Sequence, residues 1–103
     1  MRCVDDNAFA SILNERRDII LYLSADWSGP CQILTPILES VAQERRLTVV
    51  KVNIDNSPAI VQKYRVLSVP RILFIKDGEV ALDLSGNPSL RKIKESCKRV
   101  YGC

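Results

Sequence analysis

Apolar positions recur along this chain with two different periods, and the changes of period divide it into helices and strands. Over Asp5–Arg16 apolar residues return every three to four positions, which predicts an amphipathic helix capped by Asp5 or Asp6. A short strand at Arg2–Val4 is expected before it. The mostly apolar run Ile19–Ala25 is flanked by charge and predicts a central strand that is buried on both faces.

The middle of the chain repeats this order of helix and strand. From Cys31 the apolar period is helical, and Pro36 should kink that helix. The run Leu47–Ile54 predicts the next strand. Ser57 followed by a proline is typical of a capped helix start, so a short helix is expected over Pro58–Tyr64.

The last third predicts a hairpin and a final helix. A strand is expected over Arg71–Lys76, and Asp77-Gly78 is a strong signal for a tight turn into a second strand, Glu79–Leu84. Asn87-Pro88 has the pattern of a helix start, and the stripe that follows places Cys97 among apolar residues.

These elements follow one another as β-α-β-α-β-α-β-β-α. A strand, a crossover helix and a strand predict a right-handed parallel pair, whereas the hairpin must be antiparallel. We therefore expect an α/β fold with a mixed central sheet of four to five strands and about four helices on both faces. The length of 103 residues gives room for a single domain over residues 1–103.

Composition and charge exclude several classes of protein. Apolar residues make up 47% and charged residues 26%, which excludes disordered and low-complexity chains. The net charge of +3 includes a basic run at Arg91–Arg99 that is more typical of a solvated helix face than of a nucleic-acid site. No apolar stretch is long enough for a membrane span or a signal core, so we expect a cytoplasmic protein. A monomer is expected because no long apolar surface stripe is left unassigned.

The four cysteines are expected to be free thiols because nothing in the sequence indicates secretion. Cys97 is expected to pack in the core, and Cys3 to be partly buried near the first strand. Cys103 is expected to be mobile and prone to intermolecular pairing. Histidine is absent and no two cysteines have metal-ligand spacing, so no metal site is predicted. No glycine-rich nucleotide loop is present, so any nicotinamide or flavin must belong to a partner.

Candidate chemistry is concentrated in the loop between the central strand and the second helix. A thiol at a helix N-terminus has its thiolate favoured, and Cys31 has this position. Pro30 sets the first helical turn, Gly29 is expected to allow a sharp turn, and Trp27 offers an aromatic surface. Ser28 stands where a second thiol would complete a dithiol.

The segment DWSGPC resembles the Trp-Cys-Gly-Pro-Cys loop of the thioredoxin family, with Ser28 in place of the first cysteine. The resemblance covers almost the whole chain. Its other matching features are Pro36, the strand Lys51–Asp55, the Val69-Pro70 pair, the hairpin Lys76–Glu79 and Gly86. On these motifs the chain is identified as a member of the thioredoxin family, which implies the thioredoxin fold.

The resemblance also implies a mechanism and partners. In thioredoxins the first cysteine attacks a target disulfide and the second releases the reduced target. By this resemblance, position 28 is that of the nucleophilic cysteine, and Cys31 is the resolving thiol. Val69 and Pro70 match a cis-proline pair that binds the target peptide like an added strand, beside Trp27. The implied partners are disulfide-containing target proteins and a thioredoxin reductase, either NADPH-flavin or ferredoxin-linked, in the cytoplasm or in an organelle stroma after removal of a transit peptide.

Ser28 limits what the chain can do as written, because a hydroxyl cannot replace a thiol in the dithiol cycle. Either a cysteine of a working thioredoxin was replaced by engineering, or the natural protein lacks the nucleophile. No bound cofactor is expected. A redox-active disulfide with Cys31 is expected only of a parent with cysteine at position 28. Two other functions stay open: a redox-inactive peptide-binding module, and a monothiol protein whose Cys31 is capped by glutathione or metal.

Several positions depart from the family pattern. Tyr22 replaces a buried carboxylate that helps to deprotonate the resolving cysteine, and Lys51 matches a buried lysine but lacks that partner. Arg71 replaces a threonine after the proline. Asp26 is expected to be a solvated turn residue, although a carboxylate there would raise the pKa of a neighbouring thiol. The segment Leu21–Ser24 resembles the thioredoxin domain fused to some NADPH-thioredoxin reductases.

Overall fold

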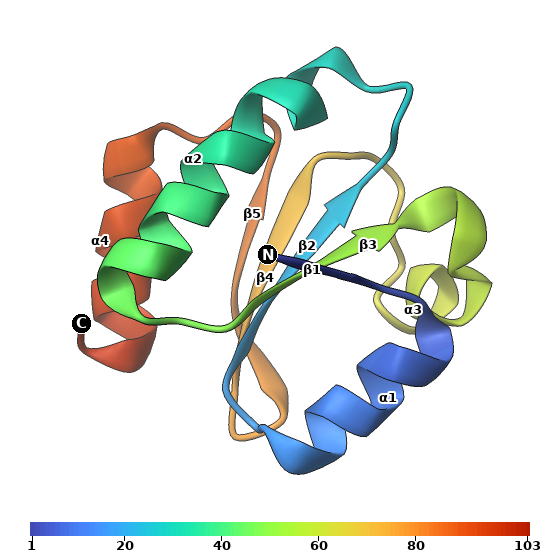
Figure 1. Ribbon diagram of the computed structural model, residues 1–103, viewed down its shortest axis with the longest axis horizontal. Helices are drawn as coiled ribbons and strands as arrows, with labels where there is room; N and C mark the ends of the chain where they lie inside the picture. Colours follow the sequence, from blue (N-terminus) through green and yellow to red (C-terminus); the bar gives the residue numbers. More distant parts are fainter.

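The computed structural model describes residues 1–103 as a five-stranded mixed sheet with helices on both faces (Figure 1). The strands are β1 (Arg2–Val4), β2 (Ile19–Ser24), β3 (Val49–Asn53), β4 (Arg71–Lys76) and β5 (Glu79–Ser85). The helices are α1 (Asp6–Glu15), α2 (Gly29–Arg45), α3 (Pro58–Lys63) and α4 (Leu90–Tyr101), with a 3-10 turn at Ile54–Asn56. The expected order of elements and the α/β class are confirmed.

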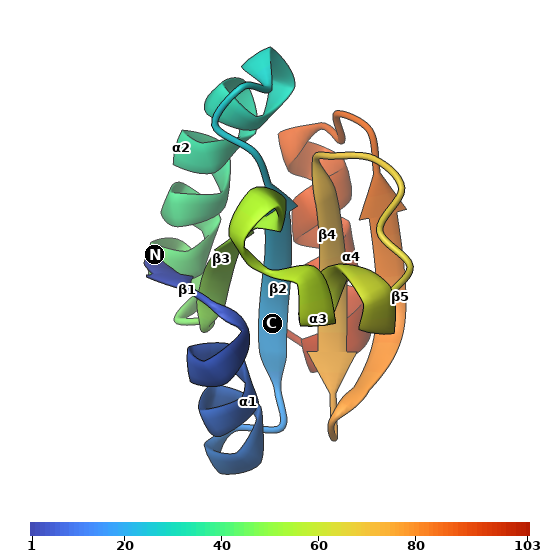
Figure 2. The same cartoon turned by 90° about the vertical axis from the view of Figure 1, so that its right-hand side faces the viewer.

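The strand order β1-β3-β2-β4-β5 places β2 at the centre of the sheet. β2 is parallel to β3 and antiparallel to β4, and the β4–β5 hairpin is antiparallel. Figure 1 shows α2 and α4 on one face of the sheet and α1 and α3 on the other, and Figure 2 shows α1 and α3 in front of it. Because both faces are covered, every residue of β2 is buried, as its apolar run predicted.

Each face of the sheet has its own apolar core, because successive strand residues point to opposite faces. On β2, Leu21 and Leu23 pack in the cluster that includes Phe9 of α1 and Ile60 of α3. Tyr22, between them, packs in the cluster of α2 and α4. The same alternation decides which residues of the central strand can reach the start of α2.

The helix starts differ from those predicted. α2 begins at Gly29, two residues before the expected start at Cys31, and it continues through Pro36 to Arg45. α4 begins at Leu90 with Ser89 as its N-cap, whose side chain accepts a hydrogen bond from the Lys92 amide. The prediction that Asn87-Pro88 starts this helix was wrong, because the serine two residues later supplies the cap.

The N-terminus of α3 is capped from another helix. Ser57 makes no side-chain cap hydrogen bond, and its buried hydroxyl has no partner. The carboxylate of Asp6 accepts hydrogen bonds from the Ala59 and Ile60 amides, each at 3.0 Å. Asp5 caps α1 through the Ala8 amide at 2.9 Å. The two adjacent aspartates therefore cap two different helices, and the predicted Ser57 cap is absent.

The cysteines outside the loop are only partly where the sequence placed them. Cys97 is fully buried, which confirms core packing. Cys3 lies in β1 as expected, but it is exposed rather than partly buried because β1 is an edge strand. Cys103 is half-buried and packs against the core cluster of α2 and α4, whereas mobility was expected. No helix has the length and apolar character required to cross a membrane.

Candidate active site

The loop from Ala25 to Cys31 connects the carboxyl end of β2 to the first turn of α2. Ser28 is the N-cap of α2, and its hydroxyl accepts a hydrogen bond from the Cys31 amide at 3.4 Å. Pro30 lies in the first helical turn, as predicted. Ser28 is 5% exposed, so this hydroxyl serves as a buried helix cap in the place expected for a nucleophilic thiol.

Gly29 has a different role from the predicted one. It is the first residue of α2, and its φ is not among the positive values found at Gly78, Gly86 and Gly102. A Cβ at Gly29 would meet no heavy atom within 4 Å. The turn into α2 therefore does not require glycine at this position for conformational reasons.

Cys31 lies in the first turn of α2 with only 3% of its surface exposed. Its carbonyl oxygen accepts hydrogen bonds from the Tyr22 and Thr35 hydroxyls, each at 2.8 Å. The thiol is thus buried, at the place that the resemblance gives to a resolving cysteine.

Tyr22 fills the space under Cys31 where the family pattern has a carboxylate. Its hydroxyl lies 3.1 Å from Thr35 Oγ1 as well as donating to Cys31. Burial raises the pKa of the Tyr22 phenol to about 12, so at neutral pH it is a hydrogen-bond donor and not a base. Lys51 is the β3 register partner of Tyr22 and is half-buried, and its ammonium makes no hydrogen bond or ion pair.

Val69 and Pro70 lie at the same end of the sheet as the loop, because Arg71 at the start of β4 is paired with Leu23 of β2. The Val69–Pro70 peptide bond is cis. Pro70 is buried and Val69 is half-buried. The structure therefore brings together two segments about forty residues apart in sequence, which the spacing alone could not place side by side.

Arg71 connects three segments around this pair. Its guanidinium forms hydrogen bonds with both carboxylate oxygens of Asp83 on β5, the shortest at 2.6 Å, and also donates to the carbonyls of Tyr64 and Arg65 at 2.9 and 3.2 Å. A planar fork suits this set of acceptors, and an ammonium does not. Arg71 thus ties the end of α3 and the segment before Pro70 to the hairpin.

Arg71→Lys is expected to lower the free energy of unfolding by about 1 to 2 kcal/mol and to speed amide exchange over residues 65–69. A lysine keeps the charge but cannot reach two carbonyls and a carboxylate together. The matched control is Arg91→Lys, because Arg91 forms an exposed pair with Glu95 within α4 and its loss should cost almost nothing. Urea unfolding and hydrogen exchange measure both effects. Equal costs at the two positions would contradict the connecting role of Arg71.

Trp27 and Asp26 lie on the surface before Ser28. The Trp27 side chain is 68% exposed, and its indole nitrogen donates to Asp55 at 3.0 Å. Asp26 is exposed, and its carboxylate accepts from Asn53 at 3.4 Å. Asp26 is therefore a surface turn residue, as expected. Three site residues, Thr35, Asp55 and Asp83, were not predicted. Only Thr35 had a signal in the sequence, because its spacing of four from Cys31 places both on one face of a helix.

Cys31 should react slowly with a bulky thiol reagent, because its sulfur is buried and Cys3 is exposed. Under native conditions we expect a maleimide polymer to label Cys3 at least about tenfold faster than Cys31. Peptide mapping of a time course measures both rates in one chain, with denatured protein as the reference. Labelling of Cys31 as fast as Cys3 would favour a protein that uses Cys31 as an exposed monothiol.

Comparisons of the sequence and of the structure with known proteins identify the same family. The Thioredoxin family model matches residues 1–99. Thioredoxin of Mycoplasmoides gallisepticum is 35% identical over 88 residues, which cover 84% of this chain and 88% of that protein. The bifunctional thioredoxin reductase/thioredoxin of Mycobacterium leprae is 32% identical over 77 residues, 73% of this chain and 17% of that protein.

Among solved structures, Fasciola hepatica thioredoxin superposes with a TM-score of 0.87 at 31% identity and covers 97% of this chain and 99% of its own. The predicted thioredoxin fold is therefore confirmed. Both a free and a reductase-fused thioredoxin are among the relatives, at similar identity. The family model matches nearly the full length of this chain, and the loop, the buried cysteine and the cis-proline lie at one end of its sheet. This chain therefore belongs to the thioredoxin family.

Proposed function

We propose that this chain is a thioredoxin-type protein dithiol-disulfide oxidoreductase in which serine replaces the attacking thiol. One observation carries the proposal: Ser28 is the N-cap of α2 and its Oγ accepts from the backbone amide of Cys31, in the first turn, at 3.4 Å. A sulfur at position 28 would take the N-cap place next to the Cys31 thiol and the positive end of the helix.

In the proposed cycle, a thiolate at position 28 attacks one sulfur of a target disulfide, and the other target sulfur leaves as a thiol. Cys31 then loses its proton and attacks the sulfur at position 28, which releases the second target thiol. Two electrons pass from the protein dithiol to the target, and a reductase returns them. The Ser28 hydroxyl is too weak an acid for the first step and forms no stable bond to sulfur, so the chain as it stands does not turn over.

Tyr22 changes how the second step would proceed. A neutral phenol that donates to the Cys31 carbonyl cannot accept the thiol proton. Lys51 does not provide a base either, because it makes no ion pair with a carboxylate. Tyr22 and Lys51 therefore supply no base for the Cys31 proton, which would pass to a base in solution.

The target peptide would bind across Val69, beside the loop. Trp27, which precedes Ser28, is 68% exposed, and Leu67, in the segment before Pro70, is 96% exposed. Such exposed apolar side chains on separate segments suit an extended peptide that adds to the backbone before a cis-proline. We propose a thioredoxin reductase as electron donor, in keeping with the M. leprae relative that is named for both activities.

The residues around Ser28 favour replacement of a functional cysteine over a natural protein without redox activity. Trp27, Pro30 and Cys31 have the form that dithiol chemistry uses, and Cys31 is buried as a resolving thiol should be. We therefore propose a Cys→Ser replacement in a working parent. Reduction of insulin by the Ser28→Cys variant, driven by a small dithiol, tests this directly.

A second function is a redox-inactive module that binds peptides at Val69-Pro70. The hydrogen bond that Ser28 makes as a helix cap favours it, because serine is stabilising at that position for reasons unrelated to redox chemistry. It predicts that Ser28→Cys binds the same peptides as the unchanged chain and reduces none of them. Peptide capture and insulin reduction, measured on both proteins, separate the two functions.

A further inference from the structure

Two cysteines that the loop does not use lie together at the end of α4. Cys97 is fully buried in the core cluster between α4, α2 and the sheet, and Cys103 packs against that same cluster. The Cys103 sulfur lies 3.9 Å from the carbonyl oxygen of Cys97. Both cysteines are free thiols. The Cys103 side chain therefore lies against the residue that carries the second thiol.

The turn after α4 and a contact from α2 hold Cys103 there. Gly102 has a φ of 77°, and its amide donates to the Lys98 carbonyl at 2.8 Å, so the chain turns back over the last helical turn. Arg45 of α2 donates to the Cys103 carbonyl at 2.6 Å. Cys103 is thus fixed both by the local turn and by a hydrogen bond from a distant segment.

The two thiols differ in access, and burial weakens the acidity of the Cys97 thiol. Cys103 is half-buried, so a small reagent can reach it before it reaches Cys97. Burial, with a smaller contribution from the nearby Cys103 thiol and an opposing one from the Arg45 guanidinium, raises the pKa of Cys97 to about 11. Tyr101 is the other titratable group that interacts with Cys97. At neutral pH, Cys97 is therefore almost entirely protonated.

We propose that Cys97 and Cys103 form a second dithiol-disulfide pair, separate from the Ser28 loop, that small disulfides such as oxidised glutathione oxidise. The Cys103 thiolate attacks one sulfur of oxidised glutathione, whose disulfide breaks, and one glutathione leaves as a thiol. The Cys97 thiolate then attacks the Cys103 sulfur, and the second glutathione leaves. Two electrons pass to the oxidant, and the protons of the two cysteines end on the two glutathione molecules.

The buried position of Cys97 determines the order and the speed of these steps. Attack on Cys103 comes first because its sulfur is accessible. Ring closure needs ionised Cys97, so it is slow at neutral pH and rises about tenfold for each pH unit below the pKa of Cys97. The glutathione adduct on Cys103 should therefore accumulate near neutral pH and give way to the internal disulfide in alkali.

The chain offers a direct test, because Lys98 and Arg99 lie between the two cysteines. The reduced protein is incubated with oxidised glutathione at about pH 7 and about pH 9, remaining thiols are alkylated, and trypsin cuts the chain. We expect a disulfide-linked pair of peptides, one ending at Lys98 and one beginning at Val100. The pair should disappear on reduction and form at least about tenfold faster at the higher pH.

Three variants test which cysteines form the disulfide, so the result does not depend on any one variant folding. Cys103→Ser should abolish the linked pair and the glutathione adduct on this helix, and Cys97→Ala should leave the adduct on Cys103. The matched control is Cys3→Ser, an exposed thiol on the edge strand, which should change nothing at α4. A glutathione adduct on Cys103 that persists at about pH 9 with no linked pair would overturn the proposal, as would a pair that links Cys103 to Cys3 or Cys31.

Discussion

Ser28→Cys should raise the rate of insulin reduction at least about 100-fold above the background of the small dithiol that drives it. The unchanged chain should stay at background. The reason is chemical: a thiol at a helix N-terminus is ionised near neutral pH, and a hydroxyl is not. Ser28 occupies the N-cap next to Cys31, so the substitution places the new sulfur where both the helix and the second thiol can act on it.

Two further variants separate the thiol from its surroundings. Ser28→Ala removes the cap without adding a thiol, so it should remain inactive and lose about 1 kcal/mol of stability. Ser28→Cys combined with Cys31→Ser should attack targets once and then hold them as mixed disulfides. If Ser28→Cys forms no mixed disulfide and no reduced insulin while its fold is intact, the oxidoreductase proposal fails and the peptide-binding module replaces it.

Tyr22→Ala should lower the free energy of unfolding by about 3 to 5 kcal/mol, which is the largest single cost we expect at the site. Tyr22 is the largest fully buried side chain that contacts the first turn of α2. Its removal leaves a cavity between β2, α2 and α4, and it also removes the hydrogen bond to the Cys31 carbonyl and the contact with Thr35. Urea unfolding monitored by circular dichroism measures this loss.

Tyr22→Phe is the matched control, because it keeps the ring and removes only the hydroxyl. The Cys31 carbonyl retains its hydrogen bond from Thr35, so no buried acceptor is left without a partner. We expect a cost of only about 1 kcal/mol. A loss as large for Tyr22→Phe as for Tyr22→Ala would mean that the hydroxyl, and not the packed ring, stabilises the helix start.

The central strand and the loop were readable from the sequence because local patterns decide them. Ile19–Ala25 is apolar between charged flanks, and only a strand covered on both faces accommodates such a run. Pro30 and Cys31 were correctly placed at a helix start because proline favours the first turn. The exact start of α4 was missed by two residues because two overlapping cap signals, Asn87 and Ser89, compete in that segment.

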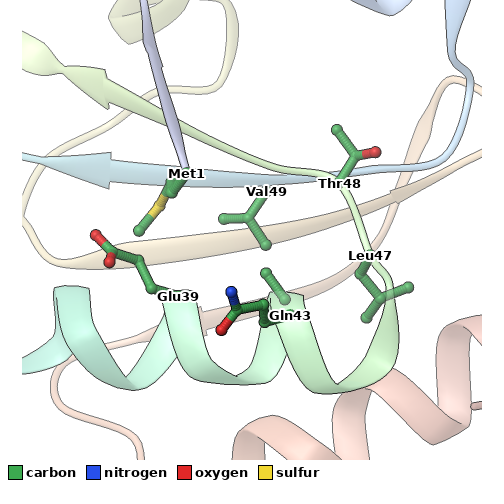
Figure 3. Close-up of a pocket in the computed structure, with 7 residues that line it drawn as sticks. Met1, Glu39, Gln43, Leu47, Thr48 and Val49 are labelled. Carbon is green, nitrogen blue, oxygen red and sulfur yellow. The ribbon is translucent and has the colours of Figure 1, made fainter.

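Contacts between distant segments could not be predicted from local sequence patterns. Nothing near α3 in sequence indicated that Asp6 would cap it, because the contact depends on how α1 and α3 pack on one face of the sheet. The pocket lined by Met1, by Glu39 and Gln43 of α2 and by Val49 of β3 is a second example (Figure 3), because its walls come from both ends of this stretch of chain. Periodicity gives the faces of an element, but not its partners.

The sequence by itself determined the order of elements, the buried central strand, the family and the serine in place of the nucleophile. The tertiary structure alone decided that Tyr22 donates to Cys31, that Arg71 joins three segments, and that Arg45 of α2 holds Cys103. The physical reason is the range of the interactions. Helical and strand periods depend on residues a few positions apart, whereas hydrogen bonds between segments depend on packing that brings distant residues within 3 to 4 Å.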